Sequence, residues 1–576
     1  MKKTSAEVAS QEALTSLFEC IKNKQHFRLE AGAGAGKTYS LIKVLEELIK
    51  ENKELYLKQG KKIACITYTN VAKDEIIART DRNPIVFCET NHAFCWSLIN
   101  PFQKALREQI PQLQNWKDKL EKESEDIQNK QIVYKLGYRS IKNGELSLHH
   151  DDIIDLTIKL LEEPKFRQIL IEKFPIILID EYQDTDKKWI NAVKTHFLDR
   201  PASPLFGFFG DHWQKIYGDG CGLIKHSKIE EINKNANFRS SKVIVEALNE
   251  MRKELPQCIS DESSDGHIHI FHTNNWEVTR QTSQHWKGDL EKEDAHKAID
   301  KVKEYLKDQG WDFSLNKTKI LMLTHKLLAN AQGYSGIANA FKHNESFVKK
   351  ENKYIAFFID QLEPIVEAFI NKKYGIMFNI LEQRMPLLNN HSDKLLWKSK
   401  MSELIELREK GKIKEIIQLL QKEDSKIKLP ESILKTEKEL SKSNNTEEQN
   451  LSSQLKESKA LHDISYSEII ALKKALDENS PFQTQHGVKG AEFENVLIVI
   501  GRGWNQYNFG EMLKWVGTGI PNGKEENFER NRNLFYVSCS RAKKRLAILF
   551  TQELEETAIE TLNKWFDPDN IIDLQQ

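Results

Sequence analysis

The sequence predicts an α/β protein with two parallel-sheet cores, each interrupted by a mainly helical insertion. Short apolar runs rich in β-branched residues, at 175–179 and 496–500 for example, are typical of strands buried on both faces. Longer stretches with helical periodicity lie between such runs. The runs form two groups, one before residue 210 and one after residue 266, so we expect two cores.

The alternation of these signals divides the chain into six segments. We expect the first core at 1–97 and 173–262 with its insertion at 98–172, and the second core at 263–340 and 479–576 with a charged insertion at 341–478. Residues 429–458 are rich in Lys, Glu, Ser and Asn, which favours a solvated linker or a mobile helix. A chain of 576 residues is too long for one hydrophobic core, which also favours several domains.

Charge and cysteine content exclude several classes of protein. Lysine plus arginine and aspartate plus glutamate number 85 each, so any nucleic-acid site must be a local track of basic and aromatic residues. The seven cysteines form no CxxC pair, which indicates neither a zinc site nor a disulfide framework. No apolar stretch is long enough to span a bilayer and no signal-peptide core is visible, so we expect a cytoplasmic protein with no membrane partner.

A glycine-rich loop follows the strand-like residues 27–30. Its sequence is Ala31-Gly32-Ala33-Gly34-Ala35-Gly36-Lys37-Thr38, and a helical pattern comes next. Glycines let backbone N–H groups curl around phosphate oxygens, and the helix N-terminus adds a partial positive charge. Lys37 would reach the β- and γ-phosphates, and Thr38 would give its hydroxyl to Mg²⁺. The sequence therefore predicts a nucleoside triphosphate site, although Ala31 replaces the glycine that usually opens this motif.

Two acids follow the apolar run at 175–179 directly. In open α/β sheets, ligands bind at the carboxyl ends of the strands, where Asp180 and Glu181 would lie. Asp180 can hold Mg²⁺, and Glu181 can orient and deprotonate an attacking water. With a phosphate loop upstream, these acids favour nucleotide hydrolysis over a strand that merely ends in a polar turn.

The remaining motifs occur in a fixed order along the chain. They lie at residues 66–72, 90–94, 210–217, 237–240, 484–493 and 533–543. Among them, GDHWQKIY at 210–217 matches a GDxxQxIY pattern, and TQHGVKGAEF at 484–493 matches a TxHxxKGxEF pattern. From Gln11 to Arg541, this series resembles the superfamily 1A DNA helicases of the UvrD/Rep type. The resemblance implies two RecA-like motor cores, with ATP and Mg²⁺ as cofactors.

The resemblance also implies roles at the nucleotide. Gln11 would read adenine, with an ordinary surface glutamine as the alternative, and the ring of Phe238 would stack on the base. Gln214 would contact the γ-phosphate, and Glu492 would accept a hydrogen bond from the ribose. Arg239 and Arg541 would act as arginine fingers, because a guanidinium neutralises charge that develops on the γ-phosphate. Arg541 would enter the site from the second core.

In relatives, several of these loops hold single-stranded DNA by hydrogen bonds to phosphates and by stacking on bases. The corresponding residues here are Thr67, Tyr68, Asn70, His92, Phe94, Tyr217, Thr484 and His486. For Tyr68 and Phe94, packing in the hydrophobic core is the alternative.

The chain departs from the family pattern after residue 217. Relatives carry an aromatic-arginine pair that stacks on bases, whereas this chain has Asp219 and Gly220. An acid repels phosphate and cannot stack, so the stepping contacts with DNA bases are in question. Trp213 is a candidate substitute, with burial in the core as the alternative.

These observations predict a DNA translocase or helicase that moves on single-stranded or tailed DNA, in the 3′ to 5′ direction by resemblance. The alternative is an ATP-hydrolysing DNA sensor that regulates a partner nuclease and unwinds little. The short first insertion, the highly charged second insertion and the altered residues Asp219 and Gly220 favour the sensor. Compact relatives of this kind occur as the helicase subunit of Gabija anti-phage systems, beside an OLD-type (Toprim) nuclease. A plain nucleotide-binding scaffold is disfavoured, because both acids and both arginines are present.

Overall fold

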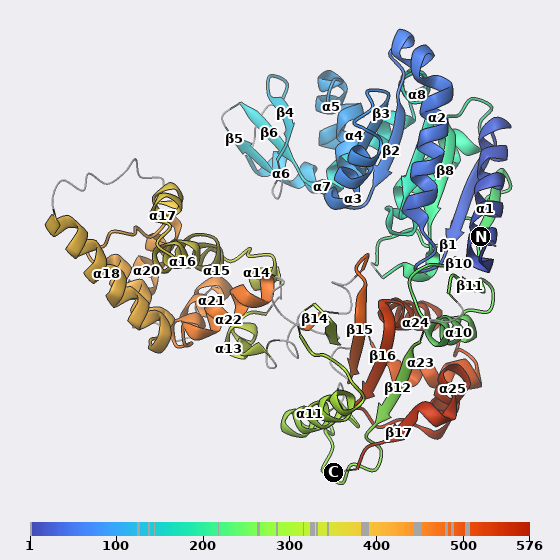
Figure 1. The fold of residues 1–576 in the computed structure, drawn as a ribbon. Helices are drawn as coiled ribbons and strands as arrows, with labels where there is room; N and C mark the ends of the chain where they lie inside the picture. Colours follow the sequence, from blue (N-terminus) through green and yellow to red (C-terminus); the bar gives the residue numbers. More distant parts are fainter. Residues whose placement is uncertain are drawn as a thin grey trace. The chain divides into compact units, whose positions relative to one another are not determined.

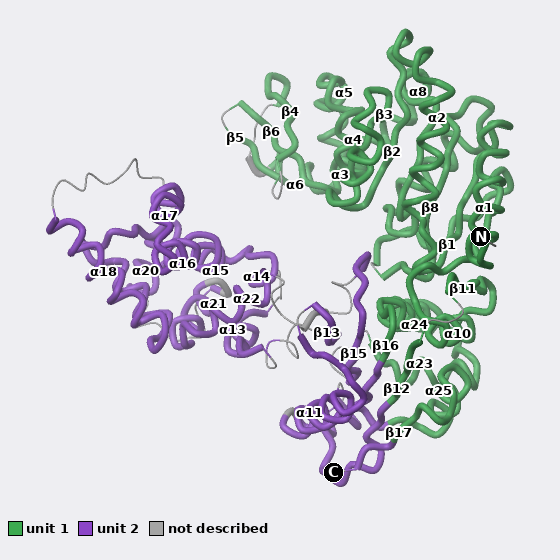
Figure 2. Tube along the Cα trace, viewed as in Figure 1, with its two compact units in different colours: residues 1–270, 506–546, 554–572 green, residues 271–505, 547–553, 573–576 purple. Residues whose placement is uncertain are grey.

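The computed structural model describes most of the chain. The described residues are 3–575 except 124–126, 136–138, 143, 217, 262–264, 284–285, 315, 323–328, 330–331, 343–344, 382–390, 443–451, 478–481, 485–488 and 502–506. The chain divides into two compact units, coloured green and purple in Figure 2. Unit 1 comprises Met1–Ile270, Gln506–Leu546 and Leu554–Ile572, and unit 2 comprises Phe271–Asn505, Ala547–Glu553 and Asp573–Gln576.

Unit 1 is built from alternating helices and strands (Figure 1). Its main elements are α1 (Ser5–Lys22), β1 (His26–Ala31), α2 (Lys37–Gln59), β2 (Ile63–Thr67), α3 (Asn70–Arg79), β3 (Val86–Thr90), α4 (Asn91–Ile99), α5 (Gln103–Gln109), α6 (Gln114–Glu123), β4 (Gln131–Tyr134), β5 (Ser140–Lys142), β6 (Glu145–Leu148), α7 (His150–Leu161), α8 (Pro164–Lys173), β7 (Ile176–Asp180), α9 (Lys187–Val193), β8 (Leu205–Gly210), β9 (Ile229–Lys234), β10 (Ala236–Asn237), α10 (Lys242–Met251), β11 (Cys258–Ile259), α23 (Phe509–Thr518), α24 (Glu525–Cys539) and α25 (Glu556–Phe566).

A six-stranded parallel sheet organises unit 1. Its strand order is β3-β2-β7-β8-β1-β9. Every residue of β7 is buried, as expected for an apolar strand covered on both faces. Successive residues of a strand point to opposite faces, so Ile177 and Ile179 join one hydrophobic cluster while Ile176 and Leu178 join another. The sheet is thus held by two hydrophobic layers, and its carboxyl edge carries the polar loops.

The first insertion is mainly helical, as predicted for 98–172, but it also contains a small sheet that was not predicted. Helices α5 to α8 are present, but β4, β5 and β6 form a three-stranded sheet among them. These strands have only three or four residues, too few to show a clear alternation of polar and apolar side chains. Ile132, Leu146 and Leu148 anchor the small sheet by joining the same hydrophobic cluster as the core strands.

Unit 2 contains the longest helical part of the chain. Its main elements are α11 (Lys292–Asp308), β13 (Thr318–Met322), α13 (Ser335–Ala340), α14 (Glu345–Val348), α15 (Lys353–Phe357), α16 (Glu363–Ile370), α17 (Tyr374–Ile380), α18 (His391–Lys410), α19 (Ile413–Gln421), α20 (Glu431–Lys442), α21 (Ser453–His462), α22 (Ser467–Leu476), β14 (Phe482–Thr484) and β15 (Phe493–Ile500). Strand β13 pairs in parallel with both β14 and β15. The whole second sheet has the order β14-β13-β15-β16-β12-β17, which adds β12 (His267–His272), β16 (Ala542–Phe550) and β17 (Ile571–Asp573). Two six-stranded sheets confirm the predicted α/β class with two cores.

Part of the segment 429–458 is a packed helix rather than a solvated linker. Helix α20 buries Ile433 and Leu440 among the hydrophobic residues of unit 2. Tyr354 donates a hydrogen bond of 2.6 Å to Glu437 on the same helix. The high charge of this segment lies on the exposed face of an amphipathic helix, which composition alone does not distinguish from a linker. Residues 443–451 lie outside the described residues.

The compact units do not follow the six expected segments. Helices α23, α24 and α25 come after residue 506 but belong to unit 1. The loop after β10 shows why, because Ser240 Oγ donates to the carbonyl of Ala542 at 2.7 Å and Ser241 N donates to that of Lys543 at 2.7 Å. Backbone acceptors near residue 542 are therefore used by the first core. None of the described helices is long and apolar enough to cross a membrane.

We predict that Gly207→Ala destabilises unit 1. Gly207 lies in the middle of β8, and a Cβ atom there would overlap the ring of Phe27 and the side chain of Leu178. Both neighbours are completely buried, so relieving the overlap should cost about 1–3 kcal/mol. Thermal unfolding measures the loss. Gly218→Ala is the matched control, since nothing lies within 4 Å of its position, and equal unfolding temperatures for the two variants would contradict the prediction.

Candidate active site

The phosphate loop connects β1 to α2 in the conformation that its glycines allow. Gly34 and Gly36 have φ values of 73° and 75°, in the left-handed region that residues with a Cβ atom avoid. A Cβ on Gly34 would also lie 2.7 Å from Cβ of Arg239. Lys37 begins α2, so the N–H groups of the first helical turn face the loop. Glycine is therefore required at position 34 for two separate reasons.

Side chains from the end of the sheet hold this loop in place. Ala33 accepts hydrogen bonds from Asn237 Nδ2 at 3.1 Å and from Gln257 Nε2 at 3.0 Å. The carbonyl of Gly34 accepts from the backbone N–H of Phe238 at 2.9 Å. Because these donors bond to carbonyl oxygens of the loop, they hold its backbone in place without using its N–H groups. Gln257 carried no motif and was missed in the sequence.

Lys37 and the two acids of the β7 loop lie together. Lys37 Nζ is 3.0 Å from Glu181 Oε2. Burial lowers the pKa of Lys37, but the carboxylates of Glu181, Asp211 and Asp180 outweigh burial and raise that pKa above its ordinary value. Glu181 has a φ of 49°, a left-handed conformation that a non-glycine residue adopts only under local constraint. The lysine therefore stays charged, and the strained backbone aims Glu181 at it.

Asp180 fits the metal-binding role predicted for it. The side chain is buried, and within the described residues its Oδ1 atom has no hydrogen-bond partner. Burial, together with the neighbouring charge of Glu181, raises the pKa of Asp180 to about 7. A buried carboxylate with an open acceptor atom, close to the first turn of α2 where Thr38 lies, matches the oxygen ligands that Mg²⁺ prefers.

Hydrogen bonds connect the β7 loop to the β8 loop. Gln183 Nε2 donates to Glu181 Oε2 at 2.6 Å, and Gln183 Oε1 accepts from the backbone N–H of Asp211 at 3.1 Å. Asp211 in turn accepts from Gln214 Nε2 at 2.8 Å. Gln214 Oε1 then accepts from Arg541 Nη2 at 3.4 Å. Thus a continuous chain of polar groups joins the half-buried Glu181 to the buried Arg541, and all its members belong to unit 1.

The two predicted arginine fingers lie in the same compact unit. Arg239 Nη1 donates to the carbonyl of Ser540 at 3.0 Å. Arg541 is only 1% exposed, and its Nε donates to the carbonyl of Val537 at 2.9 Å. Burial and the adjacent charge of Arg239 lower the pKa of Arg541 to about 9, so the guanidinium of Arg541 stays charged at neutral pH. Two guanidinium groups held close together repel each other, and an anionic ligand bound between them would relieve that repulsion.

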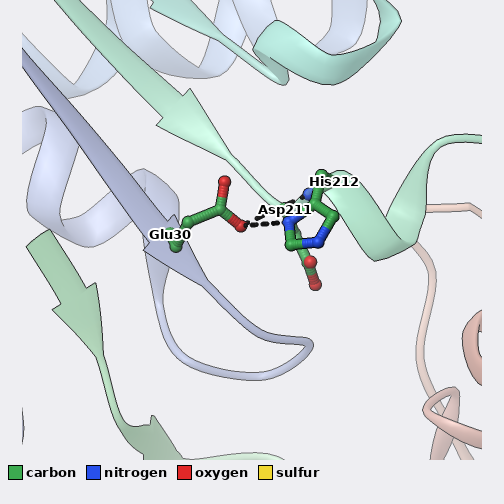
Figure 3. A group of neighbouring side chains, drawn as sticks. All are labelled: Glu30, Asp211 and His212. Carbon is green, nitrogen blue, oxygen red and sulfur yellow. Dashed lines mark hydrogen bonds and ion pairs between the residues drawn. The ribbon is translucent and has the colours of Figure 1, made fainter. Parts of the chain in front are cut away.

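A second cluster of polar groups lies at the carboxyl ends of β1 and β8 (Figure 3). Glu30, Asp211 and His212 bring their ligand atoms within 4.8 Å of one another. Arg252 already supplies a cation here, 2.6 Å from Asp211 and 3.5 Å from Glu30. Although burial raises the pKa of Asp211, Arg252 and Lys37 outweigh burial and lower it. We therefore interpret this cluster as a structural ion-pair network rather than as a metal site.

Trp213 is a packing residue of this network. It is 5% exposed, with the guanidinium of Arg532 at 3.9 Å from its ring centroid and that of Arg252 at 5.2 Å. Tyr536 packs edge-on against the same ring. The structure thus favours the buried alternative for Trp213, which is not placed to stack on a base. Arg252 and Arg532 lacked a motif and were missed in the sequence.

A cavity of about 510 Å³ lies beside the phosphate loop. Its wall includes Gln11 and Phe238, both assigned to the base by sequence, together with Gly36. Tyr39 and Lys234 complete the wall nearest the loop. The ring of Phe238 is 44% exposed, so it is available for stacking. The structure therefore brings Gln11 and Phe238 together, although 227 residues separate them in sequence.

The residues assigned to DNA have mixed surroundings. Tyr68 is 45% exposed, and Asn70 is exposed at the start of α3. His92 is half-buried, and burial followed by the charge of His150 lowers its pKa. Tyr217 and His486 lie outside the described residues, as does the side chain of Thr484, which belongs to β14.

Two of these assignments require correction. Phe94 is completely buried and packs against Phe87 and Phe174, so its ring has no free face for a base. Thr67 is 1% exposed, and its hydroxyl donates to the carbonyl of Thr69 at 3.1 Å. Both side chains are therefore buried in unit 1, Thr67 at the end of β2 and Phe94 on α4. Glu492 is exposed and belongs to unit 2, whereas the phosphate loop belongs to unit 1.

The altered residues after 217 have a structural explanation. Gly220 forms an antiparallel bridge with Asp186, and the backbone N–H of Lys187 donates to the carbonyl of Asp219 at 3.2 Å. A Cβ on Gly220 would overlap the carbonyl oxygen of Gln183. The segment therefore packs against the chain that follows the two acids, and a larger residue at 220 would prevent this contact.

Comparison with known proteins agrees with the motif order. Residues 16–219 match the AAA domain family, and residues 332–553 match the UvrD-like helicase C-terminal domain. Gabija protein GajB of Bacillus cereus strain HuB5-5 is 25% identical, over 95% of this chain and 96% of that protein. GajB of Bacillus cereus strain VD045 is 29% identical over 42% of this chain and 50% of its own length. ATP-dependent DNA helicase PcrA of Staphylococcus epidermidis is 29% identical over 39% of this chain and 37% of its own length.

We predict that Asp180→Asn stabilises the nucleotide-free protein at pH 8. The folded-state pKa of about 7 lies above the ordinary value of 3.8, so the contribution of this carboxyl to the free energy of unfolding falls as pH rises between those values. A neutral amide avoids that loss, and we expect a melting temperature about 2–4 °C higher at pH 8. The difference should disappear near pH 4. Asp219→Asn, an exposed control, should change neither value, and a lower melting temperature for Asp180→Asn at pH 8 would contradict the prediction.

Proposed function

We propose that this chain, which matches the AAA domain family and the UvrD-like helicase C-terminal domain over separate segments, hydrolyses ATP with Mg²⁺ and couples the hydrolysis to movement on single-stranded DNA, in the 3′ to 5′ direction. The observation that carries the proposal is the convergence of Lys37, Glu181 and Arg541 around one phosphate loop. Lysine, carboxylate and arginine are the groups that phosphoryl transfer to water requires. The expected compartment is the cytoplasm.

Each residue has a distinct role in the proposed reaction. Lys37 neutralises charge on the β- and γ-phosphates, and its raised pKa keeps it protonated. Glu181 orients the attacking water and accepts its proton. Thr38 and Asp180 would hold Mg²⁺, which when bound neutralises further phosphate charge. Arg239 and Arg541 stabilise the charge that develops in the transition state, and the base stacks on Phe238 beside Gln11.

Gln214 is placed to report the state of the γ-phosphate. It bonds Asp211 on one side and Arg541 on the other, and Asp211 is linked through Gln183 to Glu181. A change in phosphate occupancy alters the partners of Arg541, and the hydrogen-bond chain carries that change to the β7 and β8 loops. The DNA-facing candidates Tyr68 and Asn70 follow β2, a neighbour of β7 in the sheet. We therefore assign the DNA contact of unit 1 to Tyr68, Asn70 and His92.

A second function is favoured by the segment at 219–220. The family residues that stack on bases are absent, and the backbone of Gly220 packs against the β7 loop instead. A protein without that stacking pair can respond to DNA while unwinding little. Two relatives are Gabija proteins, which suggests anti-phage defence and a partner nuclease of the OLD (Toprim) type for this chain as well.

The two functions are separated by one pair of measurements. ATP hydrolysis is measured with and without single-stranded DNA, and strand displacement is measured on a duplex with a 3′ single-stranded tail. A translocase shows stimulated hydrolysis and displacement, whereas a sensor shows stimulated hydrolysis with little displacement. Hydrolysis that no nucleic acid stimulates would rule out both.

We predict that Glu181→Gln lowers kcat for ATP hydrolysis by about 10²–10³-fold with KM nearly unchanged, because the amide cannot accept the proton of water. Gln is isosteric with Glu, so the fold should be retained. Steady-state kinetics with saturating DNA provide the measurement. A kcat within threefold of the wild-type value would remove Glu181 from the proposed mechanism.

We also predict that Arg541→Ala lowers kcat by about 10³-fold or more, the range observed for arginine fingers. The matched control is Lys544→Ala, which removes an exposed cation from β16, the strand that follows Arg541, and leaves its backbone carbonyl bonded to Ser241. The control should retain wild-type kcat. Equal activities for the two variants would contradict a catalytic role for Arg541.

A further inference from the structure

Lys234 is a buried cation beneath the phosphate loop that the proposed mechanism does not use. It ends β9, and its side chain is completely buried. Its Nζ donates to the carbonyl of Gly36 at 3.1 Å and to Ser40 Oγ at 2.8 Å. Within the described part of the chain, no carboxylate forms an ion pair with it. Burying an ammonium group without a counter-ion costs folding free energy. We therefore ask what the position of Lys234 contributes to the site.

The two acceptors of Lys234 define the start of α2. Gly36 is the N-cap of this helix, and its φ of 75° and ψ of 49° are left-handed. The carbonyl of Gly36 also accepts from the backbone N–H of Ser40 at 3.2 Å. A single ammonium therefore holds both the last glycine of the phosphate loop and the first turn of the helix that follows it.

The same ammonium also holds an aromatic ring at the base cavity. Lys234 Nζ lies 5.5 Å from the ring centroid of Tyr39, within the range of a cation–π interaction. Tyr39 is 49% exposed and lines the cavity together with Phe238 and Gln11. Lys234 lines it too. The Lys234 ammonium thus contacts both the phosphate loop and a residue of the base cavity.

Resting on the proposed ATPase function, we propose that Lys234 is a positioning residue whose positive charge fixes the phosphate loop and the ring of Tyr39 in the geometry that binds a nucleotide. It does not touch the reacting atoms, so its loss affects nucleotide affinity more than the chemical step. A neutral side chain of similar length fills the space but neither bonds Gly36 nor attracts the ring.

This role makes nucleotide binding depend on pH. Burial lowers the pKa of Lys234 to about 8, so its charge is lost as pH rises through 8. The other ionisable groups in the cavity wall are Tyr39 on α2, Glu7 on α1 and Lys3 just before α1. The KM for ATP should therefore increase between pH 7 and pH 9 in the wild-type protein.

The test compares Lys234→Met and Lys234→Arg with the wild-type protein, with Lys43→Met as the matched control. Lys43 lies 5.7 Å from the same ring of Tyr39, but its side chain is 39% exposed and pairs with Glu46. We expect Lys234→Met to raise KM for ATP about tenfold at pH 7, the effect of losing a hydrogen bond to a charged group, with kcat within twofold. Lys234→Arg should keep KM within about threefold of wild type and show no rise at pH 9, because a guanidinium stays charged. Lys43→Met should match the wild type.

Three results would overturn the inference. The first is an unchanged KM in Lys234→Met, and the second is a wild-type KM that stays constant from pH 7 to pH 9. The third is a fall in kcat of the same fold as the rise in KM, which would indicate general damage to the site. Should a variant fail to fold, as a melting curve would reveal, the wild-type pH profile still decides. A wild-type protein without any ATP hydrolysis would instead refute the proposed function.

Discussion

The buried carboxylate of Asp211 is the group on which the arrangement of unit 1 depends. It is completely buried at the end of β8, and it accepts from Arg252, from Gln214 and from the backbone N–H of Trp213. A buried charge is tolerated only when its hydrogen bonds are complete. Trp213 and Gln214 belong to the β8 loop whereas Arg252 directly follows α10, so satisfying Asp211 brings the end of α10 and the β8 loop together. Removing Arg252 alone would leave an unpaired buried acid and should cost about 3–5 kcal/mol.

The same carboxylate links the structure to the proposed chemistry. Arg252 packs over Trp213, and Arg532 of α24 packs over that ring as well. Asn533 of α24 donates to the carbonyls of His212 and Lys215 at 3.3 and 3.0 Å. These contacts hold the middle of α24, and Arg541 follows shortly after this helix ends at Cys539. The position of the arginine finger is thus a consequence of a polar and aromatic network rather than of its own bonds alone.

Local chemistry explains what the sequence could and could not predict. The phosphate loop and the two acids were placed from sequence because glycines and a buried strand leave patterns within ten residues. For Phe94 the sequence left DNA contact and core packing open, because a ring beside a motif gives no information on which way it points, and here it enters the core. Arg252 and Lys234 were missed because a lone basic residue has no pattern. Their importance comes from burial, which depends on elements far away in sequence.

The loop at 219–220 bears on whether the protein is a motor or a sensor. Gly220 lies against the carbonyl of Gln183, the residue whose side chain joins Glu181 to the backbone of Asp211. In relatives this position carries a side chain directed at DNA, whereas here it contributes only backbone to the hydrolytic site. A segment that has no side chain to hold a base but packs on the β7 loop can still transmit a signal from the residues that we propose to sense phosphate. Stepping requires that DNA be gripped and released in register with hydrolysis, and the stacking pair provides that grip in relatives. Its replacement by a contact with the β7 loop favours regulation over processive unwinding.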